Sequence, residues 1–249
     1  MPIKRTRNIY DPSSDQPSKL SRSKLESFID CPRCFYVDRR LGVGRPSMPG
    51  FTLNSAVDEL FKKEFDQYRA DKKPHPIMVE YGIDAIPFSH SELDEWRENF
   101  KGIQIHHKPT NLIITGAVDD VWVDPDGRVM VVDYKSTSKA GEVELTDAKW
   151  HQAYRRQIEI YQWLLEQKGF EVRKEGYFVY ANGIKDVDRF DDILTFKTVI
   201  LTHEGDSSWV EQAIINAHKC LNQDTVPNPD PDCEYCQYRK AIGELDFVE

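Results

Sequence analysis

The chain has 249 residues, 39% of them hydrophobic and 30% charged, which allows one large or two small folded domains and excludes a disordered chain. No stretch is apolar over the roughly 18 to 20 residues that a membrane helix needs, and the first residues lack the apolar core of a secretory signal, so we expect a cytoplasmic protein without a membrane partner. The net charge of −9 does not exclude nucleic acid as a partner, because the first 45 residues carry an excess of lysine and arginine.

The N-terminal half begins with a polar segment and then predicts two helices. Residues 1–20 lack any periodicity, and we expect a flexible basic arm there. A short helix is expected over residues 23–30, because a capping box opens it and Cys31-Pro32 follows it. The apolar positions of residues 53–68 repeat with the period of a helix. Residues 71–108 are rich in proline and show no clear pattern.

The rest of the chain alternates between strands and helices. Residues 112–123 and 128–135 predict two strands, and Asp124-Pro125-Asp126-Gly127 between them is a turn sequence, so we expect a β-hairpin. The elements expected after it are a long helix over 147–168, strands near 176–181 and 194–201, and a helix over 207–222. No linker separates two domains in the sequence, so residues 21–249 are expected to form a single domain.

The predicted hairpin carries two carboxylates and a lysine in a pattern suited to metal-dependent hydrolysis. Side chains alternate along a strand, so Asp133 and Lys135 face the same way. Asp119 on the preceding strand can lie close to Asp133, and Asp120 is the alternative if the register shifts by one residue. Two adjacent carboxylates repel each other unless a cation lies between them, and Mg²⁺ or Mn²⁺ prefers oxygen ligands. The Lys135 ammonium could position or deprotonate an attacking water, so these residues predict hydrolysis of a phosphodiester.

An Asp and a Lys two residues apart more often form a surface ion pair, but here they belong to a longer ordered set. Gly116-Ala117-Val118-Asp119, a turn, an apolar run, Asp133-Tyr134-Lys135 and a helix follow one another at compatible spacing. This order resembles the PD-(D/E)XK nuclease superfamily, and within it the RecB-like exonuclease branch that includes CRISPR-associated nucleases. The resemblance implies that Asp119 is the first metal-binding acid and that Asp133-Tyr134-Lys135 is the (D/E)-x-K motif, with Tyr134 among the metal-binding positions.

Three further positions follow from the same resemblance. Gln157 and Tyr161 lie one turn apart in the predicted long helix and match the family's Q-x-x-x-Y motif, which implies contact with substrate and support for the site. The alternative is a glutamine that is only hydrogen-bonded in the core. Family members often carry a metal-binding histidine in the first core helix, where this chain has Asp58. A carboxylate can still bind a hard cation, although Asp58 could equally be solvated helix surface.

Four of the five cysteines form two C-x-x-C pairs, Cys31 with Cys34 and Cys233 with Cys236. In an intracellular chain such pairs predict a metal site rather than disulfides, and four sulfurs suffice for a zinc ion or a [4Fe–4S] cluster. The resemblance slightly favours the cluster, although the related iron–sulfur proteins commonly have one N-terminal cysteine and three near the C-terminus. We expect residues 21–45 and 225–240 to form this metal-binding region.

The resemblance implies an α/β fold of the restriction-endonuclease-like type, in which helices flank a mixed central sheet and the four-cysteine site joins the chain ends. It also implies a Mg²⁺- or Mn²⁺-dependent deoxyribonuclease, by analogy an exonuclease that acts on single-stranded or frayed DNA ends. Two alternatives remain open. The protein could bind nucleic acid or protein without cutting, or it could be the nuclease subunit of a larger repair or spacer-acquisition complex with a helicase or integrase partner.

Overall fold

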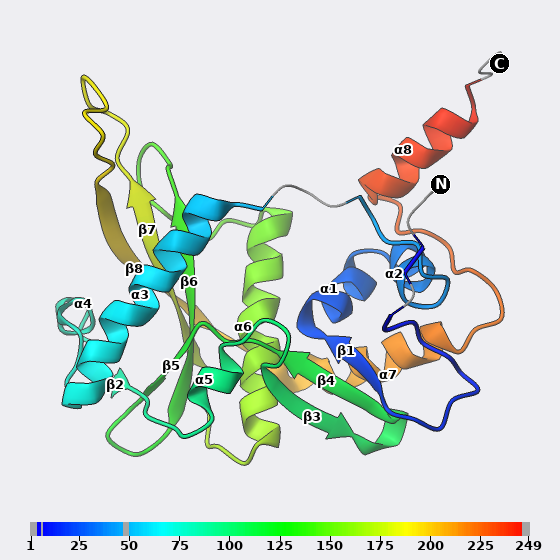
Figure 1. Ribbon diagram of the computed structural model, residues 1–249, viewed down its shortest axis with the longest axis horizontal. Coiled ribbons are helices and arrows are strands. Elements are labelled where there is room, and N and C mark those ends of the chain that lie inside the picture. Colours follow the sequence, from blue (N-terminus) through cyan, green and yellow to red (C-terminus); the bar gives the residue numbers. More distant parts are fainter. Residues whose placement is uncertain (1–3, 6, 47–49, 246–249) are drawn as a thin grey trace. The chain divides into compact units, whose positions relative to one another are not determined.

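The computed structural model describes residues 4, 5, 7–46 and 50–245, and the chain forms two compact units (Figure 1). The five-strand unit comprises Pro49–Gln104 and Gly116–Ser208, and the three-strand unit comprises Met1–Met48, Ile105–Thr115 and Trp209–Glu249. Each unit is therefore assembled from separate stretches of the chain. Within the described residues, no helix is long and apolar enough to cross a membrane.

A mixed sheet with the strand order β2-β5-β6-β7-β8 forms the centre of the five-strand unit. Its strands are β2 (Ile86–Pro87), β5 (Asp120–Val123), β6 (Val129–Thr137), β7 (Glu175–Gly183) and β8 (Phe196–Glu204). All neighbours are antiparallel except β6 and β7, which run parallel and are connected through helix α6 (Lys149–Gln167), as a parallel pair requires a crossover. This sheet with its flanking helices confirms the predicted α/β fold class.

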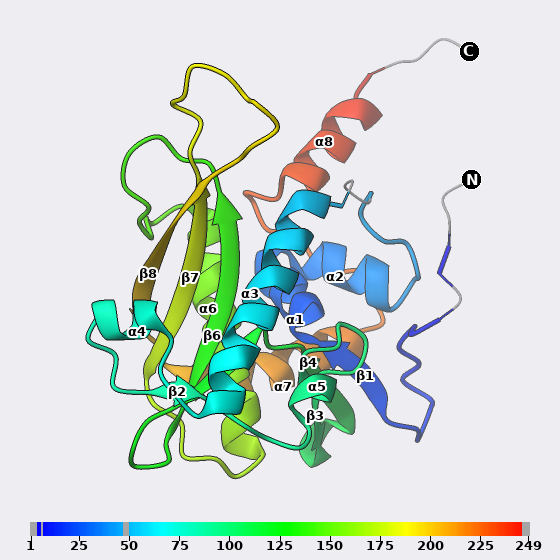
Figure 2. The ribbon, with the colours of Figure 1, turned by 60° about the vertical axis from the view of Figure 1, so that its left-hand side comes forward.

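Two long helices cover opposite faces of this sheet (Figure 2). Helix α3 (Thr52–Asp71) packs Phe61 and Phe65 into a cluster that includes Tyr134 of β6. Helix α6 lies on the other face, where the Tyr154 and Phe178 rings are 6.4 Å apart. Because side chains alternate along β6, Tyr134 faces α3, whereas Asp133 on the next position faces α6.

Two short helices complete the five-strand unit in the stretch that showed no clear pattern in the sequence. Helix α4 (Pro76–Glu80) begins with proline in its first turn, where the missing N–H costs nothing. Helix α5 (Leu93–Trp96) ends on a fully buried tryptophan, and the Trp96 carbonyl accepts a hydrogen bond from the Val118 amide. This bond holds the segment that enters β5.

In its described residues, the three-strand unit contains a small sheet with the order β1-β4-β3 and four helices. Its strands are β1 (Ser18–Ser21), β3 (Ile103–His107) and β4 (Leu112–Gly116), with a 3-10 turn, η1 (Lys108–Thr110), between the last two. Its helices are α1 (Arg22–Asp30), α2 (Pro32–Arg39), α7 (Val210–Leu221) and α8 (Glu234–Gly243), and the 3-10 turn η2 (Ser207–Trp209) leads into α7. Helices α1, α2 and α7 pack together through buried side chains that include Leu25, Phe35 and Ile214.

Two of the differences between the structure and the sequence-based expectation concern the segments that build the small sheet and the N-terminal arm. Residues 112–123 do not form one strand, because the chain leaves the small sheet after Gly116 and enters the other sheet at Asp120. Part of the expected flexible arm is ordered, since Ser18–Ser21 pairs with β4 and Tyr10 is buried with its hydroxyl 3.1 Å from His218 Nε2. A four-residue strand and a single buried tyrosine are too short to produce a periodic pattern of apolar residues. The sequence therefore could not reveal that this part of the arm is ordered.

Candidate active site and cysteine cluster

Asp119 and Asp133 lie where strands β5 and β6 meet. Asp120 pairs with Val132 in the antiparallel register, so the preceding residue, Asp119, lies beside Asp133. Asp119 Oδ2 accepts a hydrogen bond of 2.9 Å from the Tyr134 amide, and the Asp133 side chain is fully buried. Burial and the negative charge of Asp133 raise the pKa of Asp119 to about 6. The two carboxylates therefore repel each other, and a cation between them would relieve the repulsion.

Lys135 and Gln157 contact the same buried carboxylate from two elements. The Lys135 ammonium forms an ion pair with Asp133 Oδ2, and Gln157 Nε2 of α6 donates to Asp133 Oδ1 at 2.6 Å. Burial opposes the charge of Lys135, but Asp133 and Asp119 outweigh it and raise the pKa of the lysine. The ammonium also lies 4.8 Å from the centre of the Tyr154 ring on α6. Lys135 is thus held as a cation at the end of β6.

Tyr161 lies next to Gln157, as their spacing in the sequence predicted. Gln157 Nε2 also reaches the Tyr161 hydroxyl at 3.3 Å. Gly116 allows this helix to come close, because a Cβ at that position would lie 2.7 Å from Tyr161 Cε1 and from Leu164 Cδ1. The glycine three residues before Asp119 therefore has a packing role.

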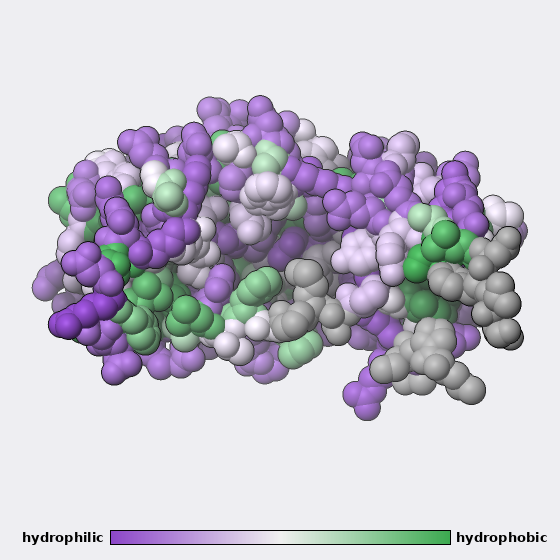
Figure 3. All heavy atoms as spheres, turned by 90° about the horizontal axis from the view of Figure 1, so that it is seen from above, coloured by the Kyte–Doolittle hydropathy of each residue, from purple (hydrophilic) through white to green (hydrophobic). Residues whose placement is uncertain are grey.

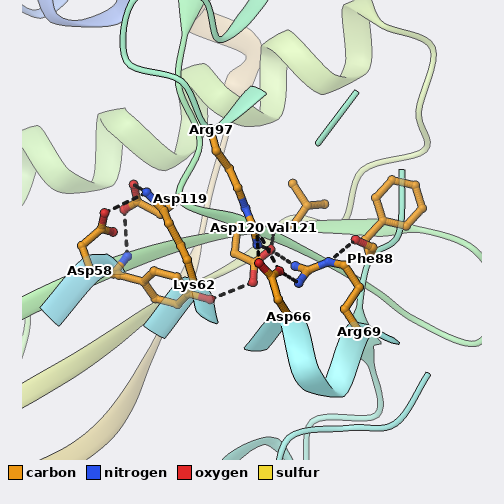
Figure 4. A network of polar contacts seen from close by, with 10 residues as sticks. Asp58, Lys62, Asp66, Arg69, Phe88, Arg97, Asp119, Asp120 and Val121 are labelled. Carbon is orange, nitrogen blue, oxygen red and sulfur yellow. Dashed lines mark hydrogen bonds and ion pairs between the residues drawn. The ribbon is translucent and has the colours of Figure 1, made fainter. Parts of the chain in front are cut away.

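Asp58 and Lys62 approach Asp119 from helix α3 (Figure 4). Lys62 Nζ lies 2.8 Å from Asp58 Oδ2 and 3.8 Å from Asp119 Oδ1, so the ammonium bridges the two acids. Burial and the charge of Asp119 raise the pKa of Asp58, although Lys62 counteracts them. Sequence reasoning singled out Asp58 but missed Lys62. The available signal was its position one helical turn after Asp58, on the same face of α3.

Asp120, the alternative to Asp119, belongs to a separate buried ion-pair network (Figure 4). Its fully buried carboxylate pairs with the guanidinium groups of Arg69 and Arg97, the latter at 2.9 Å. The Tyr134 hydroxyl donates a hydrogen bond to Asp120 Oδ2 at 2.7 Å. Asp66, which belongs to α3, forms ion pairs with both arginines. With these partners, Asp120 joins α3 to β5 and does not face Lys135. Since the Tyr134 phenol is used in this network, only the main-chain carbonyl of Tyr134 could serve as a metal ligand.

The four cysteines of the two C-x-x-C pairs lie close together in the three-strand unit. Their sulfur atoms all lie within 4.8 Å of one another. Cys31 and Cys236 are 3.9 Å apart, Cys34 and Cys233 are 3.6 Å apart, and Cys34 and Cys236 are 3.7 Å apart. A Zn–S bond of about 2.3 Å places the sulfurs of a regular tetrahedron about 3.8 Å apart. The arrangement is therefore consistent with a metal site and fits four thiolates around one ion.

Local electrostatics favour the thiolate form at part of this cluster. Burial opposes ionisation of Cys31, but backbone amides of Cys34 and Asp230 and the neighbouring thiols lower its pKa to about 7. Arg45 adds a positive charge, because its Nη2 lies 3.7 Å from Cys233 Sγ and pairs with Asp30 at 2.7 Å. Burial and the other thiols raise the pKa of Cys236, so loss of all four protons requires a cation.

Comparison with known proteins identifies the family. The family model described as "PD-(D/E)XK nuclease superfamily" matches residues 51–241. The chain belongs to the PD-(D/E)XK nuclease superfamily. The match spans every candidate residue around Asp133 as well as Cys233 and Cys236, and members of this superfamily use divalent metals.

Two solved structures that are similar to this nuclease are distant from it in sequence. A candidate exonuclease from Eubacterium rectale has 12% sequence identity and a TM-score of 0.41, with 93% of this chain and 90% of that chain covered. A protein called SSO0001 has 14% identity and a TM-score of 0.35, with 92% and 87% covered. No curated protein matches the sequence.

Proposed function

We propose that this protein is a Mg²⁺- or Mn²⁺-dependent deoxyribonuclease, and that it acts as an exonuclease on single-stranded or frayed DNA ends. The observation that carries the proposal is the meeting of Asp119, Asp133 and Lys135 at one point, with Gln157 fixed on the buried carboxylate. Oxygen ligands beside a charged lysine suit phosphodiester hydrolysis, in which negative charge grows on the phosphate as water attacks. Membership of the nuclease superfamily supports the same reaction class.

In the proposed mechanism, Asp119 and Asp133 would hold the divalent cation, and Asp58 and the Tyr134 carbonyl could supply further oxygen ligands. When bound, the ion polarises the scissile phosphate and lowers the pKa of water. Lys135 orients the attacking water and stabilises charge on the phosphate, because its ammonium is kept beside Asp133. Gln157 holds the Asp133 carboxylate in one orientation through Oδ1, which keeps Oδ2 directed at the lysine.

At the four cysteines we propose a single zinc ion with a structural role. Three of the sulfur separations are 3.6 to 3.9 Å and all of them are within 4.8 Å, which favours one tetrahedral ion over a [4Fe–4S] cluster, in which each thiolate binds a different iron. Metal analysis of purified protein tests this assignment. Colourless protein with one zinc per chain is expected, whereas brown protein with cysteine-dependent visible absorption would establish the cluster instead.

A cleavage assay tests the proposed function. Labelled single- and double-stranded DNA is incubated with the wild type in Mg²⁺, Mn²⁺ or EDTA, beside the Lys135→Ala variant. Cleavage should require the metal and fall by at least ~10²-fold in the variant, the usual scale for loss of an electrostatic catalytic group. Lys139→Ala is the matched control, since Lys139 is exposed and pairs with Glu144. Undiminished cleavage by Lys135→Ala in EDTA would refute the mechanism, and binding of DNA without cleavage would support a binding protein instead.

A further inference from the structure

A cavity of about 680 Å³ opens beside the cysteine cluster, within the three-strand unit. One wall comes from α2 and the segment after it, with Cys34, Val37 and Leu41, and the other comes from α8, with Tyr235 and Cys236. A volume of this size accommodates a nucleoside-sized group. The cavity shares no lining residue with the candidate active site, all of whose residues belong to the five-strand unit.

The charge and the aromatic groups of this cavity favour a strand of nucleic acid. Its described lining residues include three arginines, Arg33, Arg45 and Arg239, and no aspartate or glutamate. Tyr238 is 70% exposed, and the Arg45 guanidinium lies 4.5 Å from the centre of the Tyr235 ring. Aromatic rings stack on bases without regard to sequence, while arginines attract the phosphates between them. A cavity with both features suits a single strand better than an uncharged ligand.

Two of the arginines are free to meet a ligand. Arg33 donates Nε to the Pro227 carbonyl at 2.9 Å, which leaves its terminal nitrogens without a protein partner among the described residues. Arg239 forms no ion pair with any residue that the structure describes. Arg45 already contacts Asp30 and a cysteine sulfur. Its contribution to ligand binding is therefore expected to come more from its guanidinium plane, which lies over the Tyr235 ring, than from its charge.

The cysteine cluster holds this cavity together. Every residue of α8 is described and none of them is buried, so hydrophobic packing cannot fix the helix. The attachment comes from Cys236 and Cys233, whose sulfurs approach Cys34 of α2 at 3.7 and 3.6 Å. Both walls of the cavity therefore depend on the metal site.

We propose that this cavity binds a segment of single-stranded nucleic acid, with a base on Tyr238 and adjacent phosphates at Arg33 and Arg239. The proposal rests on the proposed nuclease function and names a second contact for its substrate.

Fluorescence anisotropy with a labelled oligodeoxythymidylate tests the proposal without hydrolysis. All proteins carry Lys135→Ala, and no divalent metal is added. Tyr238→Ala should weaken binding by about fivefold or more, the loss expected for one stacked base, whereas Tyr238→Phe should bind like the parent. Arg239→Ala should reduce the slope of log affinity against log salt by about 0.7, the value for one phosphate contact on a single strand. Tyr81→Ala and Lys108→Ala, at exposed positions outside the cavity, should change neither quantity.

Competition identifies the occupant. An abasic oligomer of equal charge should compete less well than the oligodeoxythymidylate with the parent, and equally well with Tyr238→Ala. An acidic peptide that competes as well as the oligonucleotide would overturn the proposal in favour of a protein partner. Parent-like binding by both Tyr238→Ala and Arg239→Ala also overturns it. If the wild type cleaves nothing while these variants still bind more weakly, the cavity stands and only the proposed hydrolysis fails.

Discussion

Lys62 lies where a cation would lie between Asp58 and Asp119. Its ammonium is 2.8 Å from one carboxylate and 3.8 Å from the other, so it neutralises part of their charge when no metal is bound. A divalent ion at Asp119 would meet a positive charge on the neighbouring helix and would compete with it for the same oxygens. Lys62 is therefore expected to weaken metal binding while it stabilises the metal-free protein.

Replacement of this lysine should make Mn²⁺ bind more tightly. Lys62→Met keeps the chain length and removes the charge, and we expect the Mn²⁺ dissociation constant to fall about tenfold, which is the scale of one partly screened charge at this distance. Isothermal titration calorimetry on metal-free protein measures it directly. Lys63→Met is the matched control, since Lys63 is exposed and pairs with Glu59. Unchanged or weaker Mn²⁺ binding in Lys62→Met would contradict this role.

The raised pKa of Asp119 predicts a pH dependence. With a pKa of about 6 in the fold and the ordinary value of 3.8 when unfolded, the native state holds this proton more tightly than the unfolded state. The associated stability is present at low pH and is lost as the pH rises through 6. Metal-free Asp119→Asn should therefore gain stability over the wild type on going from pH 5 to pH 7, on the order of 1 kcal/mol.

Urea unfolding of the two proteins at both pH values measures the difference. Asp71→Asn provides the control, because Asp71 is a mostly exposed carboxylate of α3. In the same pH range Mn²⁺ binding by the wild type should weaken as the pH falls, because the proton competes with the metal. A stability difference between wild type and Asp119→Asn that does not change with pH would show that the carboxyl titrates normally.

The contacts within each pair of candidate residues were predictable because the two residues are close in sequence. Asp133 and Lys135 lie on one face of a strand, and Gln157 and Tyr161 lie one turn apart on a helix, so spacing alone relates the members of each pair. The contact of Lys62 with Asp119 joins a helix to a distant strand, and no periodicity encodes such a contact.

The ion-pair network around Asp120 connects secondary-structure elements and is not part of the candidate active site. Arg69 of α3, Arg97 after α5 and Tyr134 of β6 converge on one fully buried carboxylate at the start of β5. The two guanidinium groups compensate the buried charge, so removal of the carboxylate leaves them without that partner in the interior. Asp119 and Asp120 are adjacent in sequence but face different surroundings, one the candidate metal site and the other this network.

Substitution of each acid should separate stability from activity. Asp120→Ala should lower the free energy of unfolding by roughly 3–5 kcal/mol, as expected when a buried ion pair loses one partner. Asp119→Ala should cost little stability but abolish metal-dependent cleavage. Thermal denaturation and the DNA cleavage assay on both variants give the comparison. A stable Asp120→Ala protein that has lost only its activity would assign the metal-binding acid to Asp120 instead.

At the level of elements, the long helices and the β5–β6 hairpin were correctly predicted because their signals are strong. Helix α3 repeats apolar residues over about four turns, and Gly127 adopts φ +86° in the turn that joins the strands. The single strand expected over 112–123 was wrong, because alternation of apolar residues does not show that a chain changes sheets. The capping box expected at Ser23 is also absent, since the N-cap of α1 is Ser21, two residues earlier, and its side chain makes no capping hydrogen bond.

Across the whole molecule, the cysteine cluster joins segments that are far apart in the chain. Cys34 and Cys233 are 199 positions apart, yet their sulfurs are 3.6 Å apart. The sequence predicted this meeting from the two C-x-x-C motifs. The sequence did not predict the division into two units. Residues 105–115 belong to the three-strand unit but lie in sequence between the two parts of the other unit, and their composition is not that of a linker.

Loss of one cysteine should affect the three-strand unit as a whole. Cys31→Ser removes a ligand whose residue is fully buried, and we expect loss of the bound metal together with a clear drop in thermal stability, because metal binding is coupled to folding. Metal analysis and calorimetry measure both effects. Cys220→Ser is the matched control, since Cys220 is a buried cysteine outside the cluster, and it should retain the metal. Metal-free Cys31→Ser with unchanged stability would show that the site is dispensable for folding.

The separation of the two cysteine pairs also sets an order of events during synthesis. A ribosome adds about 5–20 residues per second, so Cys233 emerges on the order of 10–40 seconds after Cys34. For that interval the first pair can offer only two sulfurs, and it is accessible to other metals and to other thiols. Helix α8, which buries none of its own side chains, cannot dock before the second pair arrives. The three-strand unit can therefore be completed only after the second pair of cysteines has been synthesised.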